Sequence, residues 1–384
     1  MTVIPFQIAI PQSALDDLHQ RLRLVRWPDA EQNTGWGMGT SLDYLKELTA
    51  YWQSQYDWRA HETQLNQFNQ FVAEIDGSKI HFIHERGQGP KPKPLLLLHG
   101  WPDSFYRFHK VIPLLTDPAR FGGSAEDSFD VIIPSLPGFG FSSRPTEADG
   151  MRSTRTADLL AKLMTDELGY ERYLVAGGDI GARITRLLAL NYPAQVEGIH
   201  LTDIGFPRDI SFPAAIPDPL PVEQQFMGAT QFWFVMEGAY AAVQSSRPQT
   251  LAFALNDSPV GLAAWIIDKF RAWSDCGGNL EQCFSKDELL TNIMIYWLTE
   301  TISSSMRLYF EDGRTPPQIA AGQRIEVPAA VTLFPKDFTR PPREIAARFL
   351  QVRQWTEMER GGHFAALEAP TIYSENLRAF ARML

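Results

Sequence analysis

The sequence predicts an α/β fold, in which a mostly parallel sheet carries helices on both faces and a helical insertion. Short apolar runs typical of buried strands alternate with segments of helical periodicity through most of the chain. Such alternation favours parallel strands joined by helices. The rhythm stops between about residues 206 and 325, where helical patterns follow one another without a strand. A third observation is a glycine-rich junction between a strand and a helix at residues 174–182.

Composition narrows the class of protein before any motif is considered. The 384 residues exceed the usual size of one domain, so a large domain with an insertion, or two domains, is expected. A net charge of −10 disfavours nucleic acid or an anionic membrane as partner. The N-terminus has neither the basic region of a signal peptide nor the apolar length of an anchor. We therefore expect a cytoplasmic protein that acts on a small molecule.

The first part of the chain, residues 1–78, is expected to form a helical segment that packs on the core. A helix follows Ser13, a second opens on a serine, and Asp76-Gly77 marks a turn. Beyond that turn the first strands of the core are expected. The predicted helices cover 14–25 and 41–56, and the predicted strands cover 79–86 and 93–100.

The rest of the chain divides into a core, residues 79–205 and 326–384, and a helical lid, residues 206–325. A proline-rich run at 213–223 opens the lid and cannot form a long helix. The lid should cover the carboxyl ends of the strands, where α/β sheets bind ligands. Further core strands are predicted at 130–138, 173–178, 198–203 and 329–335, and lid helices at 223–243, 261–273 and 286–310.

The glycine-rich junction places an aspartate where a nucleophile would stand. Asp179 is flanked by Gly177, Gly178 and Gly181 in LVAGGDIGA. This is the G-x-nucleophile-x-G elbow of α/β-hydrolases, a sharp turn that exposes the middle side chain. A carboxylate there attacks carbon and forms an ester on the enzyme, which points to epoxide opening or carbon–halogen cleavage. The alternative is an ordinary turn with an acid at a helix start.

Two downstream residues complete a nucleophile, acid and histidine in the chain order of that fold. The base is expected at His363, in a loop that opens on Gly361 and Gly362. Its acid partner is expected at Asp337, which follows the last predicted core strand and could orient the imidazole. Asp203 also ends a strand and is the competing acid.

An oxyanion hole is expected from the loop HGWP, residues 99–102. The backbone N–H groups of Trp101 and Ile180 could both face the developing charge. Pro102 indicates a fixed turn, and whether its peptide bond is cis stays open. In the lid, the phenols of Tyr240 and Tyr309 could donate a proton to a leaving alkoxide. Tyr296 is instead expected in the core.

These motifs together resemble the microsomal-type epoxide hydrolases, including their soluble bacterial and fungal members. The resemblance covers essentially the whole chain and implies the α/β-hydrolase fold, a nucleophile, base and acid at the three positions above, and proton donation by the two lid tyrosines. The membrane anchor of the microsomal members is missing, so no membrane attachment is expected. The motifs are HGWP, GGDIG, EGAYAAVQ, MRLYFED, FPKD and RGGHFAALE, with RLRLVRWPD, YWQSQYDWR and IDGSKIHFIHE near the N-terminus.

We therefore expect an epoxide hydrolase that needs no cofactor and no metal and forms a vicinal diol. A haloalkane or haloacid dehalogenase would share the aspartyl ester, and a non-catalytic binding protein could share the scaffold. The aromatic lid favours an apolar or aromatic epoxide. A homodimer is left open, and so is pairing of Cys276 with Cys283, although reduced cysteines are favoured. The candidate pocket residues are Trp101, Pro102, Phe232 and Trp233.

Overall fold

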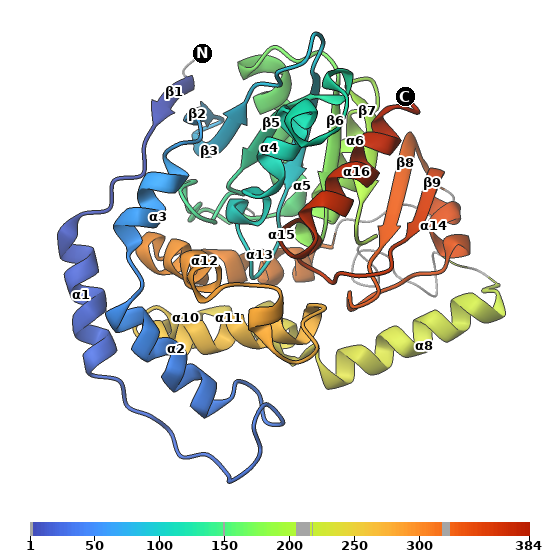
Figure 1. Cartoon of the computed structure of the whole chain (residues 1–384). Helices are drawn as coiled ribbons and strands as arrows, with labels where there is room; N and C mark the ends of the chain where they lie inside the picture. The colour runs from blue at the N-terminus through green and yellow to red at the C-terminus, as the bar shows by residue number, and fades with distance from the viewer. Residues whose placement is uncertain (1–2, 149, 205–215, 217, 317–322) are drawn as a thin grey trace.

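The computed structural model describes residues 3–148, 150–204, 216, 218–316 and 323–384. Within these residues the strands form one sheet in the order β1-β2-β3-β5-β4-β6-β7-β8-β9 (Figure 1). At one side of the sheet, β1, β2, β3 and β5 pair antiparallel with one another in that order. The strands from β5 through β4, β6, β7 and β8 to β9 are parallel. Their bounds are β1 Val3–Phe6, β2 Gln70–Ile75, β3 Ser78–Glu85, β4 Lys93–Leu98, β5 Phe129–Pro134, β6 Tyr173–Gly177, β7 Val196–Leu201, β8 Ile325–Leu333 and β9 Leu350–Glu357.

Helices cover both faces of this sheet, as expected for parallel strands joined by crossovers. The helices α5 and α6 pack together on one face, and α4 packs with α16 on the other (Figure 1). The bounds are α1 Gln12–Arg23, α2 Leu42–Ser54, α3 Trp58–Leu65, α4 Val111–Thr116, α5 Ser153–Lys162, α6 Ile180–Asn191, α8 Pro221–Met236, α9 Ala239–Ser246, α10 Pro248–Leu255, α11 Pro259–Trp273, α12 Lys286–Thr299, α13 Ile302–Arg314, α14 Arg343–Phe349, α15 Ala365–Glu368 and α16 Pro370–Ala381.

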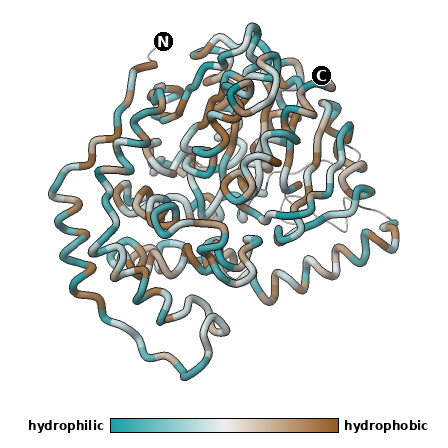
Figure 2. The backbone as a smooth tube through the Cα atoms, viewed as in Figure 1, coloured by the Kyte–Doolittle hydropathy of each residue, from teal (hydrophilic) through white to brown (hydrophobic). Residues whose placement is uncertain are grey.

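The predicted fold class is confirmed, because the core strands lie close to where the apolar runs placed them. In β4 the four leucines Leu95–Leu98 are all buried, which explains a strand with no polar alternation. Figure 2 shows hydrophobic stretches gathered in the centre of the molecule, where the strands lie. The sheet therefore supplies a buried platform for the junctions at its carboxyl ends.

The N-terminal segment contributes more to the sheet than its sequence indicated. Asp76 and Gly77 adopt positive φ of 48° and 76°, which forms the predicted turn and joins β2 to β3 in a hairpin. The strands β1 and β2 were not predicted. The first helix begins at Gln12 with Pro11 at its N-cap, so the expectation that it follows Ser13 was wrong by two residues. The helices α1, α2 and α3 contact α11 or α12.

The helices α8 to α13 lie between β7 and β8 in the chain, where the strand rhythm stops. The expected helix at 286–310 is broken into α12 and α13, because Glu300 adopts a left-handed φ of 52° that ends α12. The pattern at 223–243 likewise spans α8 and α9. Part of the proline-rich run at 213–223 lies outside the described residues. The division into core and lid as separate units stays a prediction.

Three further expectations concern membrane spans, metal sites and the pairing of cysteines. No described helix combines the length and apolar character needed to cross a membrane; α10 and α11 reach these limits only as a pair bent by 118°. Among the described residues, no group of three or more His, Cys, Asp or Glu could hold a metal ion. Cys276 and Cys283 are both free thiols.

Candidate active site

The predicted elbow lies between β6 and α6 and holds Asp179 in a strained conformation. Asp179 has φ 56° and ψ −129°, a region that costs a non-glycine residue on the order of 1–3 kcal/mol. The glycines around it are required by space. A Cβ on Gly181 would lie 2.1 Å from the carbonyl oxygen of Leu98, and one on Gly177 would lie 2.5 Å from that of Gly181. The turn therefore forces the carboxylate out of the sheet.

The loop after β4 approaches this carboxylate closely. The Trp101 N–H donates to Asp179 Oδ1 at 2.9 Å, and the Ile180 N–H also hydrogen-bonds the carboxylate. Gly100 permits this approach, because a Cβ there would lie 2.3 Å from Asp179 Oδ1. The peptide bond between Trp101 and Pro102 is cis. The two predicted oxyanion donors, the N–H groups of Trp101 and Ile180, thus both hydrogen-bond the Asp179 carboxylate.

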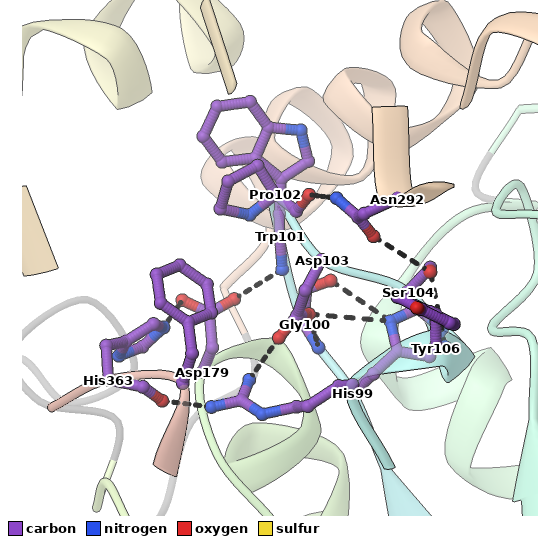
Figure 3. A network of polar contacts seen from close by, with 12 residues as sticks. His99, Gly100, Trp101, Pro102, Asp103, Ser104, Tyr106, Asp179, Asn292 and His363 are labelled. Atoms are coloured by element: carbon purple, nitrogen blue, oxygen red, sulfur yellow. Dashed lines mark hydrogen bonds and ion pairs between the residues drawn. The ribbon is translucent and has the colours of Figure 1, made fainter. Parts of the chain in front are cut away.

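His363 lies beside the Asp179 carboxylate, on the side away from Trp101 (Figure 3). It joins this carboxylate to that of Asp337. Its Nδ1 is 2.9 Å from Asp337 Oδ1, and its Nε2 is 3.5 Å from Asp179 Oδ2. Asp203 does not take the place of the acid, since its carboxylate accepts a hydrogen bond from the Thr339 hydroxyl at 3.1 Å. The structure therefore pairs the histidine with Asp337.

The carboxylates of Asp179 and Asp337 flank the His363 imidazole and shift its pKa. Burial lowers the pKa of His363, but the charges of Asp337 and Asp179 and their hydrogen bonds outweigh it and raise that pKa to about 10. Burial likewise raises the pKa of Asp179, yet His363 and the N–H groups of Trp101 and Ile180 hold it below its usual value. At neutral pH the site therefore holds an ionised Asp179 facing an imidazolium.

The helices α9 and α13 bring both predicted tyrosines to the same loop. Tyr240 on α9 stacks on the Trp101 indole with ring centroids 5.2 Å apart, and Tyr309 on α13 meets that indole edge-on at 6.1 Å. The two tyrosine rings are 6.3 Å apart. Tyr296 is buried as expected, and its hydroxyl donates to the Asp103 carbonyl at 2.7 Å.

An aromatic cluster around His363 was not predicted from the sequence. The ring centroid of Trp273, the last residue of α11, lies 5.2 Å from those of both Tyr240 and His363. The Trp273 carbonyl also accepts a hydrogen bond from the backbone N–H of His363 at 2.8 Å. Phe338 lies 4.5 Å from the same imidazole. The only signal for Phe338 was its position next to Asp337. The buried Lys269 ammonium lies 5.3 Å from the Tyr240 ring.

The four candidate pocket residues do not all reach the site. Trp101 and Pro102 belong to the loop that faces Asp179. Trp233 stacks on Phe338 at 4.8 Å and so borders the aromatic cluster. Phe232 is 67% exposed, which corrects its assignment to the pocket. Neighbouring helix residues point about 100° apart, so α8 can turn only one of this pair inward.

Comparison with known proteins places these features in a family context. Residues 3–108 match a family described as Epoxide hydrolase N terminus, and residues 93–264 match the alpha/beta hydrolase fold. A protein of Stigmatella aurantiaca, described provisionally as an epoxide hydrolase, is 44% identical over 100% of this chain and 85% of its own length. Epoxide hydrolase 1 of Oryctolagus cuniculus is 35% identical over 100% and 89%, respectively.

The tertiary structure also has a solved counterpart of nearly the same extent. Juvenile hormone epoxide hydrolase from the silkworm Bombyx mori superimposes with a TM-score of 0.86 at 30% sequence identity. The alignment covers 100% of this chain and 94% of the silkworm chain. The likeness therefore extends over the whole length of this chain.

Proposed function

Because this chain belongs to the microsomal-type epoxide hydrolase family, it is an epoxide hydrolase that acts on a small-molecule epoxide, and we propose that it does so through an ester on Asp179. One observation carries this mechanism. The two oxygens of Asp179 face different groups: Oδ1 accepts the Trp101 N–H, and Oδ2 faces His363 Nε2. One oxygen is thus held as a future oxyanion, and the other is left to attack.

In the first step, Asp179 Oδ2 attacks one oxirane carbon and the bond from that carbon to the epoxide oxygen breaks. The electron pair goes to that oxygen, which takes a proton from the phenol of Tyr240 or Tyr309. Both rings lie against Trp101, whose backbone holds the nucleophile. General acid assistance of this kind typically contributes about 10²–10⁴-fold. The product is a hydroxyalkyl ester of Asp179.

Ester formation removes the negative charge of Asp179 and so lowers the pKa of His363, whose imidazolium returns a proton to the tyrosinate left by the first step. In the second step, the neutral His363 takes a proton from water at Nε2, and the water oxygen adds to the ester carbonyl carbon. Negative charge then develops on Oδ1, which the N–H groups of Trp101 and Ile180 stabilise. The bond from carbon to the alkyl-bearing oxygen breaks, the proton passes to that oxygen, and the diol leaves. Asp337 orients the imidazole through Nδ1 and stabilises its charged form.

We further propose that the epoxide is apolar or aromatic. The rings of Trp101, Tyr240, Trp273 and Phe338 surround the imidazole and the phenols, and aromatic rings bind apolar groups by area and by ring contacts. Their flat faces offer stacking surfaces that a short aliphatic epoxide would leave largely unused.

The test of this proposal is diol formation from a panel of aryl and short aliphatic epoxides, with haloalkanes run alongside. We expect diol from the epoxides, a higher kcat/KM for the aryl members, and no halide release. Equal kcat/KM across the panel would remove the aromatic preference, and halide release without diol would replace the proposed chemistry with dehalogenation.

Replacing both lid tyrosines should separate epoxide opening from halide chemistry. Tyr240→Phe or Tyr309→Phe alone should slow ester formation, and the double variant should nearly abolish it, because an alkoxide needs a proton whereas a halide leaves without one. The loss should be about 10²–10⁴-fold in the single-turnover rate constant. Tyr173→Phe is the matched control, because Tyr173 is a buried tyrosine at the start of β6, outside this pair. A double variant that opens epoxides at the wild-type rate would remove the tyrosines from the mechanism.

A further inference from the structure

A buried ion pair lies directly behind the two loops that carry the base and the oxyanion donor. Arg107 Nη1 donates to Asp103 Oδ2 at 2.6 Å, and the two residues are 3% and 2% exposed. Neither residue has a role in the steps described above. Charges are costly to bury, so a pair this deep is expected to hold further hydrogen bonds.

The remaining hydrogen bonds of the pair reach both loops (Figure 3). Asp103 Oδ1 accepts the Gly100 N–H at 3.0 Å, one residue before the Trp101 N–H that faces Asp179. Arg107 Nη2 donates to the backbone carbonyl of His363. A single guanidinium is therefore joined to the oxyanion loop through Asp103 and to the histidine loop directly.

The geometry suits arginine and no other side chain. The two Nη atoms form a rigid planar fork, and each is hydrogen-bonded to a partner on a different loop. A lysine would bring one ammonium on a flexible stem and could not hold both partners at fixed separation. Phe364, next to His363, lies 5.7 Å from the guanidinium carbon and limits its position further.

We propose that Arg107 and Asp103 are positioning residues, which set the separation between the His363 base and the Trp101 oxyanion donor. The inference rests on the proposed ester mechanism and adds residues to it. Ester hydrolysis requires both groups at once, because the water activated by His363 must reach a carbonyl whose oxygen sits on the Trp101 N–H. Ester formation uses Asp179 and the tyrosines and does not require His363 to accept a proton.

The oxyanion loop has a second support, so that changes at Arg107 should leave it folded. The lid helix α12 holds the loop through Asn292 Nδ2, which donates to the Pro102 carbonyl at 2.9 Å, and through the Tyr296 hydroxyl on the Asp103 carbonyl. The Ser104 hydroxyl also donates to Asn292 Oδ1 at 3.0 Å. The histidine loop is held independently by Glu368, whose carboxylate accepts the Phe364 N–H at 2.9 Å.

The experiment measures ester formation and ester hydrolysis separately in Arg107→Lys and Arg107→Met, by quenched single turnover and mass spectrometry of the intact full chain. We expect the hydrolysis rate constant to fall about 10²-fold, the scale of a misplacement near 1 Å, with little change in ester formation. The ester should therefore accumulate. Asp103→Asn, which keeps an acceptor for the Gly100 N–H, should show a smaller fall in the same step.

Arg348→Lys is the matched control, because Arg348 also makes a forked pair with a buried carboxylate. Its Nε and Nη2 lie 2.5 Å and 2.8 Å from the two oxygens of Glu223, between α14 and α8. This variant should lose thermal stability without changing the ratio of the two rate constants. The ratio is a readout that lost stability alone would not move.

Each outcome bears on one of the two proposals. Equal slowing of both steps in Arg107→Lys and Asp103→Asn would overturn the positioning role and leave the pair structural. If Arg107→Met does not fold, those two milder variants decide the question. If the wild-type enzyme forms no ester at Asp179, the proposed mechanism fails instead.

Discussion

Replacing Asp179 with alanine is expected to remove turnover while leaving the protein folded. The Asp179 carboxylate is the nucleophile that forms the ester. Removing the nucleophile from a set of residues that act together in catalysis lowers kcat on the order of 10⁴–10⁶-fold. His363 keeps its partner Asp337, so the alanine variant leaves no unpaired buried imidazolium. Diol formation and thermal unfolding of the same preparations measure the two properties.

Asp179→Gly is the matched control for stability. Asp179 holds a φ of 56°, which glycine adopts without strain, so this variant should be at least as stable as Asp179→Ala and equally inactive. Loss of activity in a variant relieved of strain cannot be ascribed to a damaged turn. Substantial activity in either variant would assign the nucleophile elsewhere.

An isotope experiment tests the same residue in the unaltered enzyme. In heavy-oxygen water, the first turnover should place the label in the Asp179 carboxylate, because water adds to the ester carbonyl and the original carboxylate oxygen leaves with the diol. Mass spectrometry of the peptide that contains Asp179 measures this incorporation. Solvent oxygen in the first diol would mean that water attacks the epoxide directly.

His363→Gln is expected to stop ester hydrolysis and to spare ester formation. Glutamine keeps a donor for Asp337 but cannot accept the proton of the attacking water, so the second step should slow by about 10²–10⁴-fold. Intact protein should then gain the mass of one substrate, attached at Asp179. Protein that stays unmodified while wild-type enzyme consumes the same substrate would show that His363 is also required for ester formation.

The pH dependence of the two steps follows from the same pair of charges. The carboxylates of Asp337 and Asp179 raise the pKa of His363 to about 10 against the effect of burial, so the free enzyme holds an imidazolium that cannot act as a base. Ester formation neutralises Asp179 and must lower that pKa. The hydrolysis rate should therefore rise with pH through a pKa below 10, whereas ester formation should stay flat because the pKa of Asp179 is lowered. In His363→Gln the rise should disappear.

The nucleophile and the core strands could be predicted because their signals are local. The elbow needs glycine at positions where a Cβ would meet the backbone, as at Gly181, and that need is visible in the sequence. The four consecutive leucines of β4 likewise indicate a buried strand, and all four are buried. By contrast, the four-residue strand β1 and the eight-residue strand β9 carry little apolar alternation, and their place depends on pairing with β2 and β8.

The choice between acids shows where local signals end. Asp203 and Asp337 follow β7 and β8, which are neighbours in the sheet, so each ends a strand near the histidine loop. Only the path of the loop after β8 brings Asp337 to Nδ1 of His363. On α8, the sequence likewise could not tell which of two adjacent aromatic residues, Phe232 or Trp233, turns toward the site.

By itself, the sequence determined the chemical groups, the chain order of nucleophile, acid and base, and the class of fold, since these depend on residue identity and short-range periodicity. The tertiary structure decided which groups meet. Trp273 contacts both Tyr240 and His363. Arg107 hydrogen-bonds the carbonyl of His363, a residue 256 positions further along the chain, and so joins two loops that are distant in the sequence. Such contacts depend on how separate elements pack, and no local pattern in the chain records the distance between them.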